Sequence, residues 1–194
     1  MMGLLHKIIL SLICIFAICI GATAHAQGIV VKQAELEKTD TGWHLNANFS
    51  ITLPAGLENA LKKGVTLYFV SEFMLTRGRW YWFDERAVRV ERQIRLSHQP
   101  LINQYRITVG DFTFSATSLP EALRVAGTVG GWSVIEAAAI SPTKQYDAGV
   151  RMTLDLGKLP KPFQVDALNS KDWSLAGEWL RFPFNVSMGN VVGR

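Results

Sequence analysis

The sequence has 194 residues, a formal net charge of +4 and 48% hydrophobic residues. Its two cysteines, Cys14 and Cys19, both precede residue 27, so the chain beyond them has no thiol for a disulfide, a thiolate metal site or a nucleophile. The positive charge is weak and scattered, which argues against a nucleic-acid-binding surface.

The first 26 residues have the pattern of a signal peptide. Lys7 precedes an uncharged, predominantly apolar segment at 8–20, and a small-x-small motif ends at Ala26. The apolar segment has 13 residues, whereas a membrane-spanning helix needs about 20. We therefore predict cleavage between Ala26 and Gln27 and a periplasmic protein with no transmembrane span after cleavage. The alternative is an inner-membrane protein anchored by an uncleaved signal.

Alternation of apolar and polar residues predicts two strands at the start of the remaining chain. Residues 29–38 alternate loosely, and residues 43–53 alternate without a break. A short helix is expected within 53–64, because apolar residues recur at helical spacing and Gly64 is a suitable stop. Residues 65–75 form an apolar-rich segment that predicts a third strand.

A turn signal at 76–79 predicts a hairpin whose return strand begins with the aromatic residues 80–83. Residues 87–96 then alternate again, with charged and amide side chains on the polar side. Arg92 interrupts the apolar side of this strand, and we expect a β-bulge there.

The second half of the chain predicts further short strands and one more helix. The helix begins after Ser118, because Ser118 and Glu121 have capping-box spacing and Pro120 lies in the first turn. Residues 159–165 contain two prolines and are predicted to form an extended connection. Strands are expected at 103–109, 111–116, 132–140, 150–156 and 173–186.

About nine short strands at roughly ten-residue spacing, with two short helices, are typical of a mainly β protein. We predict a signal peptide at 1–26 and a single β-rich domain at 27–194. The predicted fold is an antiparallel β-sandwich of the Ig-like or a related kind. The alternative is a closed barrel of the lipocalin type, although Gly42 and Trp43 are adjacent here and do not match the Gly-x-Trp of that family.

The aromatic residues 80–83 and the charges after them are the best candidate for a functional surface. On a strand, side chains at alternate positions share a face, so the aromatic rings divide between two faces. One interpretation is a surface that stacks on sugar rings or anchors a protein partner. The other is a central strand buried on both sides whose charged end is exposed. The candidate partner or ligand surface consists of Arg79, Tyr81, Trp82, Asp84 and Glu85.

The sequence predicts no catalytic, metal or cofactor site. Asp84 and Glu85 are adjacent and point to opposite faces of a strand, whereas glycosidases need two carboxylates that face one site. Glu72 could lie across the hairpin from one of them. An ion pair between this hairpin and Arg77 or Arg79 is the simpler expectation.

The chain also resembles a known family over most of residues 27–194. The resemblance rests on Trp-Tyr-Trp-Phe-Asp-Glu at 80–85 and on Leu-Pro-Lys-Pro at 159–162, which leads to Trp173, Leu175 and Trp179. This family consists of short secreted proteobacterial proteins classed only as a domain of unknown function, often encoded beside a sensor kinase of the nitrogen-regulation type. The resemblance implies a periplasmic or envelope protein and assigns no catalytic or binding residues.

Three functions follow as hypotheses. The first is a non-enzymatic protein-interaction module linked to envelope signalling, with a membrane protein such as a sensor kinase as its partner. The second is a carrier or sensor of a small apolar or glycan ligand. The third and least favoured is an envelope hydrolase that uses Asp84, Glu85 or Glu72. We expect neither nucleic acid nor a cofactor as a partner.

Overall fold

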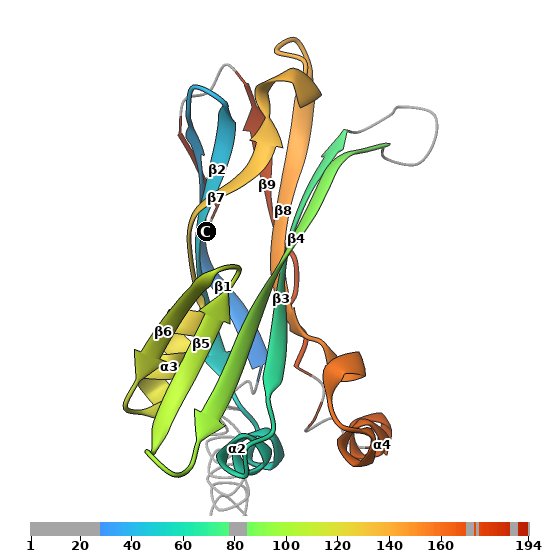
Figure 1. Cartoon of the computed structure of the whole chain (residues 1–194). Helices are drawn as coiled ribbons and strands as arrows, with labels where there is room; N and C mark the ends of the chain where they lie inside the picture. The colour runs from blue at the N-terminus through green and yellow to red at the C-terminus, as the bar shows by residue number, and fades with distance from the viewer. Residues whose placement is uncertain (1–27, 78–84, 170–172, 174, 187–189, 194) are drawn as a thin grey trace, which may run out of the picture.

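Two antiparallel sheets form the body of the protein (Figure 1). The computed structural model describes residues 28–77, 85–169, 173, 175–186 and 190–193. The mainly β, sandwich-like fold predicted from the sequence is confirmed. The described strands form two separate sheets and do not close into a barrel, so the lipocalin-type alternative is wrong.

Ten described strands build these sheets. They are β1 (Gly28–Lys38), β2 (Gly42–Thr52), β3 (Leu67–Arg77), β4 (Glu85–Gln99), β5 (Gln104–Val109), β6 (Phe112–Ala116), β7 (Thr128–Glu136), β8 (Gln145–Leu154), β9 (Leu180–Asn185) and β10 (Val191–Gly193). The smaller sheet has the order β10-β1-β2-β7, and the larger has the order β6-β5-β4-β3-β8-β9. We call the side of each sheet that faces the other sheet its inner face.

Three described α-helices and two short 3-10 helices connect the strands. They are α2 (Ala55–Lys62), α3 (Leu119–Ala126), α4 (Lys161–Asn169), η1 (Ala137–Ala139) and η2 (Leu156–Lys158). α3 has the predicted cap, because Ser118 Oγ accepts a hydrogen bond from the Glu121 amide at 3.4 Å. The Glu121 carboxylate in turn accepts one from the Thr117 amide at 3.1 Å.

α4 corrects a prediction, since the sequence indicated an extended connection at 159–165. The carbonyl of Pro160 accepts hydrogen bonds from the amides of Phe163 and Gln164, at 2.9 and 3.2 Å, and so starts a helix. Pro162 is the second residue of this helix. A proline is compatible with the first turn because the amide it lacks would have no partner within the helix.

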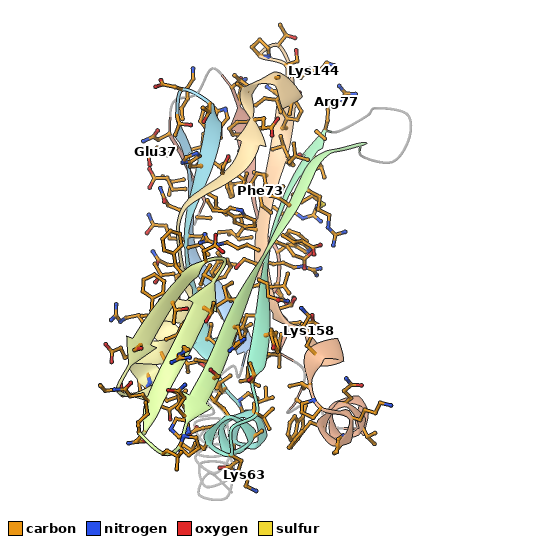
Figure 2. All side chains as sticks on the ribbon, viewed as in Figure 1. Glu37, Lys63, Phe73, Arg77, Lys144 and Lys158 are labelled. Atoms are coloured by element: carbon orange, nitrogen blue, oxygen red, sulfur yellow. The ribbon has the colours of Figure 1, made fainter. Side chains whose placement is uncertain are left out.

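The core lies between the inner faces of the two sheets. Trp43 and Phe49 alternate with polar residues along β2 and are buried, as predicted. Phe73 of β3 is fully buried and points into the space between the sheets (Figure 2). Trp43 contacts Phe184 of β9 edge-to-face, with ring centroids 4.9 Å apart. Each such aromatic contributes about 1.5–3 kcal/mol through burial, and these contacts hold the sheets together.

β7 covers only part of the sandwich, and α3, which precedes it in the chain, covers the part next to the start of β7. β7 pairs with β2 between Gly42 and Asn48, and beyond this point the Phe49 amide donates to the Gly127 carbonyl at 2.8 Å. A Cβ at Gly127 would lie 2.2 Å from the Phe49 carbonyl oxygen, so glycine is required where the helix end meets the strand. α3 therefore packs against the inner face of β4, β5 and β6 (Figure 1).

Candidate functional site

The surface predicted from the aromatic hairpin lies outside the described residues. Its members within residues 78–84 are Arg79, Tyr81, Trp82 and Asp84, and the description of Glu85 stops at its backbone. The two arms of the predicted hairpin are confirmed, because β3 and β4 pair as antiparallel strands up to Arg77 and Glu85. The role of this surface stays a prediction.

The predicted signal peptide, with Ala26 and Gln27 at the cleavage point, falls outside the described residues as well. Among the helices that the structure describes, none is long and apolar enough to cross a membrane. Within the same residues, no group of three acidic, histidine or cysteine side chains lies close enough together to hold a metal ion.

A buried carboxylate lies at the centre of the outer face of the six-stranded sheet. Glu72 of β3 is 5% exposed and accepts a hydrogen bond at each oxygen. Arg151 Nε donates to Oε1 at 2.7 Å, and Arg89 Nη2 donates to Oε2 at 2.9 Å. The Arg151 guanidinium lies 4.5 Å from the ring centroid of Trp179. We call Glu72, Arg89, Arg151 and Trp179 the Glu72 cluster.

The predicted ion pair between the hairpin and Arg77 or Arg79 stays a prediction, because residues 78–84 lie outside the described residues. Glu72 pairs with Arg151, its direct neighbour in the β3–β8 ladder, and with Arg89, two residues along β4 from its direct neighbour Glu91. With two guanidinium groups on its oxygens, Glu72 is held as part of an ion-pair network.

Cations predominate around this cluster. Residues that pair directly across neighbouring strands point to the same face, and the row Arg89, Met74, Gly149 and Arg181 crosses four strands on the outer side. The described arginines of this outer face are Arg89, Arg95, Arg106, Arg151 and Arg181, which we call the basic face. The described carboxylates of the strands on the same side are Glu72, Glu91 and Asp147.

The inner face of the same sheet holds an arginine as well. The β3–β4 ladder is regular at Arg92, which pairs with Ser71, and its irregularity lies near Thr76 instead. The bulge predicted at Arg92 is therefore wrong, and the residue points toward the inner side. Among the described residues, Arg92 has no hydrogen-bond or ion-pair partner. Burial lowers the pKa of its guanidinium below the usual value.

Ser71 is the neighbour of Arg92 in this ladder and is also unusual. Its side chain is fully buried, and its Oγ has no hydrogen-bond partner within the described part of the chain. A buried hydroxyl without a partner destabilises a protein by about 1–3 kcal/mol. Two residues whose polar groups have no partner in the described part of the chain are therefore neighbours in the ladder on the inner face.

Arg92 lines a hollow of about 500 Å³, which we call the Arg92 hollow. Its floor is the inner face of β4, β5 and β6, and its walls are α3 and the start of β7. Two phenylalanines of β6 that line it are largely exposed, Phe112 at 68% and Phe114 at 48%. The remaining lining residues are Val109, Arg124, Val125, Thr128 and Gly130.

A second hollow of about 820 Å³ lies on the other side of α3. It is lined by the end of β2, by α2 and by residues of α3, and it shares Arg124 and Thr128 with the Arg92 hollow. Of its three lining cations, Lys32, Lys62 and Arg124, Lys62 has a counter-charge, because its Nζ lies 2.6 Å from Glu58 Oε1. The Arg92 hollow differs in that its described lining includes no carboxylate.

Comparison with known families gives one match. A family model described as "Domain of unknown function (DUF4390)" matches residues 26–183. The chain belongs to this family. The DUF4390 match includes the Glu72 cluster and all residues that line the Arg92 hollow. Neither a curated protein nor a solved structure matches the chain.

Sequence reasoning noticed Arg92 only as an interruption of an apolar pattern. A charged residue on the apolar side of a strand was the available signal, and we interpreted it as a change of backbone register. Arg124 and the exposed Phe112 and Phe114 gave no separate signal, because strands and helices from different parts of the chain form the hollow together.

Proposed function

We propose that this DUF4390 protein is a non-enzymatic interaction module, exported to the cell envelope, that docks an acidic surface of a partner protein on its basic face. The observation that carries the proposal is the Glu72 cluster. Arg89 and Arg151 remain 44% and 30% exposed while Glu72 holds both in place. An arginine already held in one conformation loses less entropy when it pairs with a partner's carboxylate.

The composition of the basic face also fits a docking surface. Arginine and tryptophan are the residue types most often found at the energetic centre of protein interfaces. Trp179 lies against Arg151 and over Gly149, where an added Cβ would lie 3.1 Å from the indole ring. The excess of arginines over carboxylates on this face favours an acidic partner.

The proposed location rests on the signal-peptide pattern and on the family resemblance. Both point to the periplasm, and the resemblance makes the outer part of a membrane sensor kinase the first partner to test. The predicted surface of Arg79, Tyr81, Trp82, Asp84 and Glu85 belongs to the connection between β3 and β4 and to the start of β4, the strands that carry Glu72 and Arg89. We include it in the proposed docking surface.

A cross-linking pull-down from intact cells that express the tagged protein tests this proposal. We expect one dominant envelope protein to be enriched by the wild type. The double variant Arg95→Glu and Arg181→Glu should lose it, because both changes reverse the charge of the basic face. Lys38→Glu is the matched control, since Lys38 is exposed on β1 of the other sheet.

Two results would contradict the proposal. One is enrichment of no specific partner by the wild type. The other is an equal yield of the partner from the double variant and from the Lys38→Glu control. A Tyr81→Ala and Trp82→Ala variant tests the predicted hairpin surface in the same assay, and it should reduce the yield of the partner without unfolding the domain.

A further inference from the structure

The inner side of the six-stranded sheet supports a separate binding site that does not depend on the proposed function. We propose that the Arg92 hollow binds a small amphipathic anion. Its carboxylate or phosphate head pairs with Arg92, and its hydrocarbon body lies against Phe112, Phe114 and Val125.

The charges that line the Arg92 hollow favour an anionic ligand. Its described lining residues include two arginines, Arg92 and Arg124, and no carboxylate. Arg92 is partly buried, and burial lowers the pKa of its guanidinium, yet an arginine stays protonated near neutral pH. A partly desolvated cation without a counter-charge destabilises the free protein, and an anionic head group would remove that penalty.

The remaining lining requires an apolar body. Phe112 and Phe114 belong to the edge strand β6 and point to the same side as the buried Val109 and Ile107 with which they pair. They stay exposed because β7 and α3 do not extend over them. A hydrocarbon chain on these two rings would remove apolar surface from water.

The size and shape of the hollow favour a small molecule over a long polymer. A volume of about 500 Å³ lies within the usual range for small-ligand sites, about 300–1,000 Å³. Arg92 is partly buried and pairs with the buried Ser71 in the β3–β4 ladder, whereas Phe112 and Phe114 are largely exposed. An amphiphile would therefore enter with its head first, and Arg124 on α3 provides a second cation for it.

Calorimetric titration of the purified protein tests this inference with three probes of equal chain length: decanoate, decyl phosphate and the neutral decanol. Decanoate or decyl phosphate should bind more tightly than decanol by at least about tenfold, because only the anions form a hydrogen-bonded charge pair with Arg92. The tighter of the two anions identifies the head group. Arg92→Gln should abolish this preference, and Lys144→Gln, an exposed cation at the far end of the molecule, should keep it (Figure 2).

A second variant tests the hollow without changing Arg92. Phe112 and Phe114 line the hollow and are 68% and 48% exposed, so neither ring is needed to fill the core. Phe112→Ala combined with Phe114→Ala should therefore fold, and it should weaken the binding of decanoate and decanol alike.

Three results would overturn the inference. The first is equal affinity of the wild type for the anions and for decanol, which would leave an apolar groove without a role for Arg92. The second is an anion preference that survives in Arg92→Gln, or decanoate binding that is unchanged in the Phe112→Ala and Phe114→Ala variant. The third is that none of the three probes binds. This result would overturn the inference even if an acidic, apolar peptide bound to the hollow, because the proposed ligand is a small molecule.

Discussion

Two arginines of β4, three residues apart, have opposite surroundings. Arg89 lies on the outer face, 2.9 Å from Glu72 and 3.0 Å from Glu91. Arg92 lies on the inner face, where no described residue pairs with it and where burial lowers its pKa. The comparison shows that the partner, rather than the residue type, decides whether a charge holds a fold together or is available to a ligand.

The two kinds of charge also have opposite effects on the stability of the free protein. A carboxylate enclosed by two guanidinium groups stabilises the arrangement that encloses it, and loss of Glu72 would leave Arg89 with Glu91 alone and Arg151 without a carboxylate among the described residues. A partly buried cation without a partner has the opposite effect, so its removal stabilises the free protein. Binding sites are common places for such locally unfavourable groups.

The largest effect is expected from Glu72→Ala. The free energy of unfolding should fall by about 2–3 kcal/mol. Breaking a fully buried pair costs about 3–5 kcal/mol. The loss is smaller here because Arg89 and Arg151 stay partly in contact with water. Urea denaturation measures this change. Glu91→Ala is the control, since Glu91 is 51% exposed and should change stability by less than about 0.5 kcal/mol. Equal losses in the two variants would show that the Glu72 cluster does not stabilise the fold.

The next effect has the opposite sign. Arg92→Met should raise the free energy of unfolding by about 1 kcal/mol, because it removes a desolvated charge and keeps the apolar stem. The same denaturation experiment measures it. A loss of stability in this variant would mean that Arg92 has a counter-charge in solution, and the comparison with Arg89 would then fail.

A smaller gain in stability is expected from Ser71→Ala on the inner face of β3. Removing a buried hydroxyl without a partner should raise the free energy of unfolding by about 0.5–1 kcal/mol. Thr76→Val on the same strand is the matched variant, because Thr76 Oγ1 donates to the Asp147 carbonyl at 3.2 Å. That variant should lose about 1 kcal/mol. If both variants lower the free energy of unfolding, the Ser71 hydroxyl has a hydrogen-bond partner in solution, such as an internal water.

The smallest effect is expected on the outer face away from the cluster. Arg95 is exposed and has no hydrogen-bond or ion-pair partner among the described residues. Arg95→Gln should change the free energy of unfolding by less than about 0.5 kcal/mol. The thermal unfolding midpoint should therefore stay nearly the same as in the wild type. A larger loss would show that the basic face is required for folding as well as for docking.

Local patterns predicted most of the fold. The alternation over 43–53 predicted β2 and its buried face, and the capping residues Ser118 and Glu121 predicted the start of α3. The prolines at 159–165 misled the prediction, because proline fits the first turn of a helix as well as an extended chain. The strand expected over 132–140 ends at Glu136, where three alanines form η1.

The candidate sites depend on contacts between distant parts of the chain, which the sequence does not show. Glu72 and Arg151 are neighbours only because β3 pairs with β8 in one particular register. The Arg92 hollow requires that β7 begin only at Thr128 and that α3, which precedes it, cover β5 and β6. The surface predicted at 79–85 was inferred from composition alone, and its test is the pull-down.

Thermal unfolding of the wild type and of Arg92→Met, each with and without decanoate, tests the central claim most directly. We predict a higher midpoint for Arg92→Met without ligand, and a larger rise on adding decanoate for the wild type than for Arg92→Met, since a ligand stabilises the state that binds it. A lower midpoint for Arg92→Met, together with the same decanoate effect in both proteins, would contradict the claim that Arg92 is left without a partner in order to bind an anion.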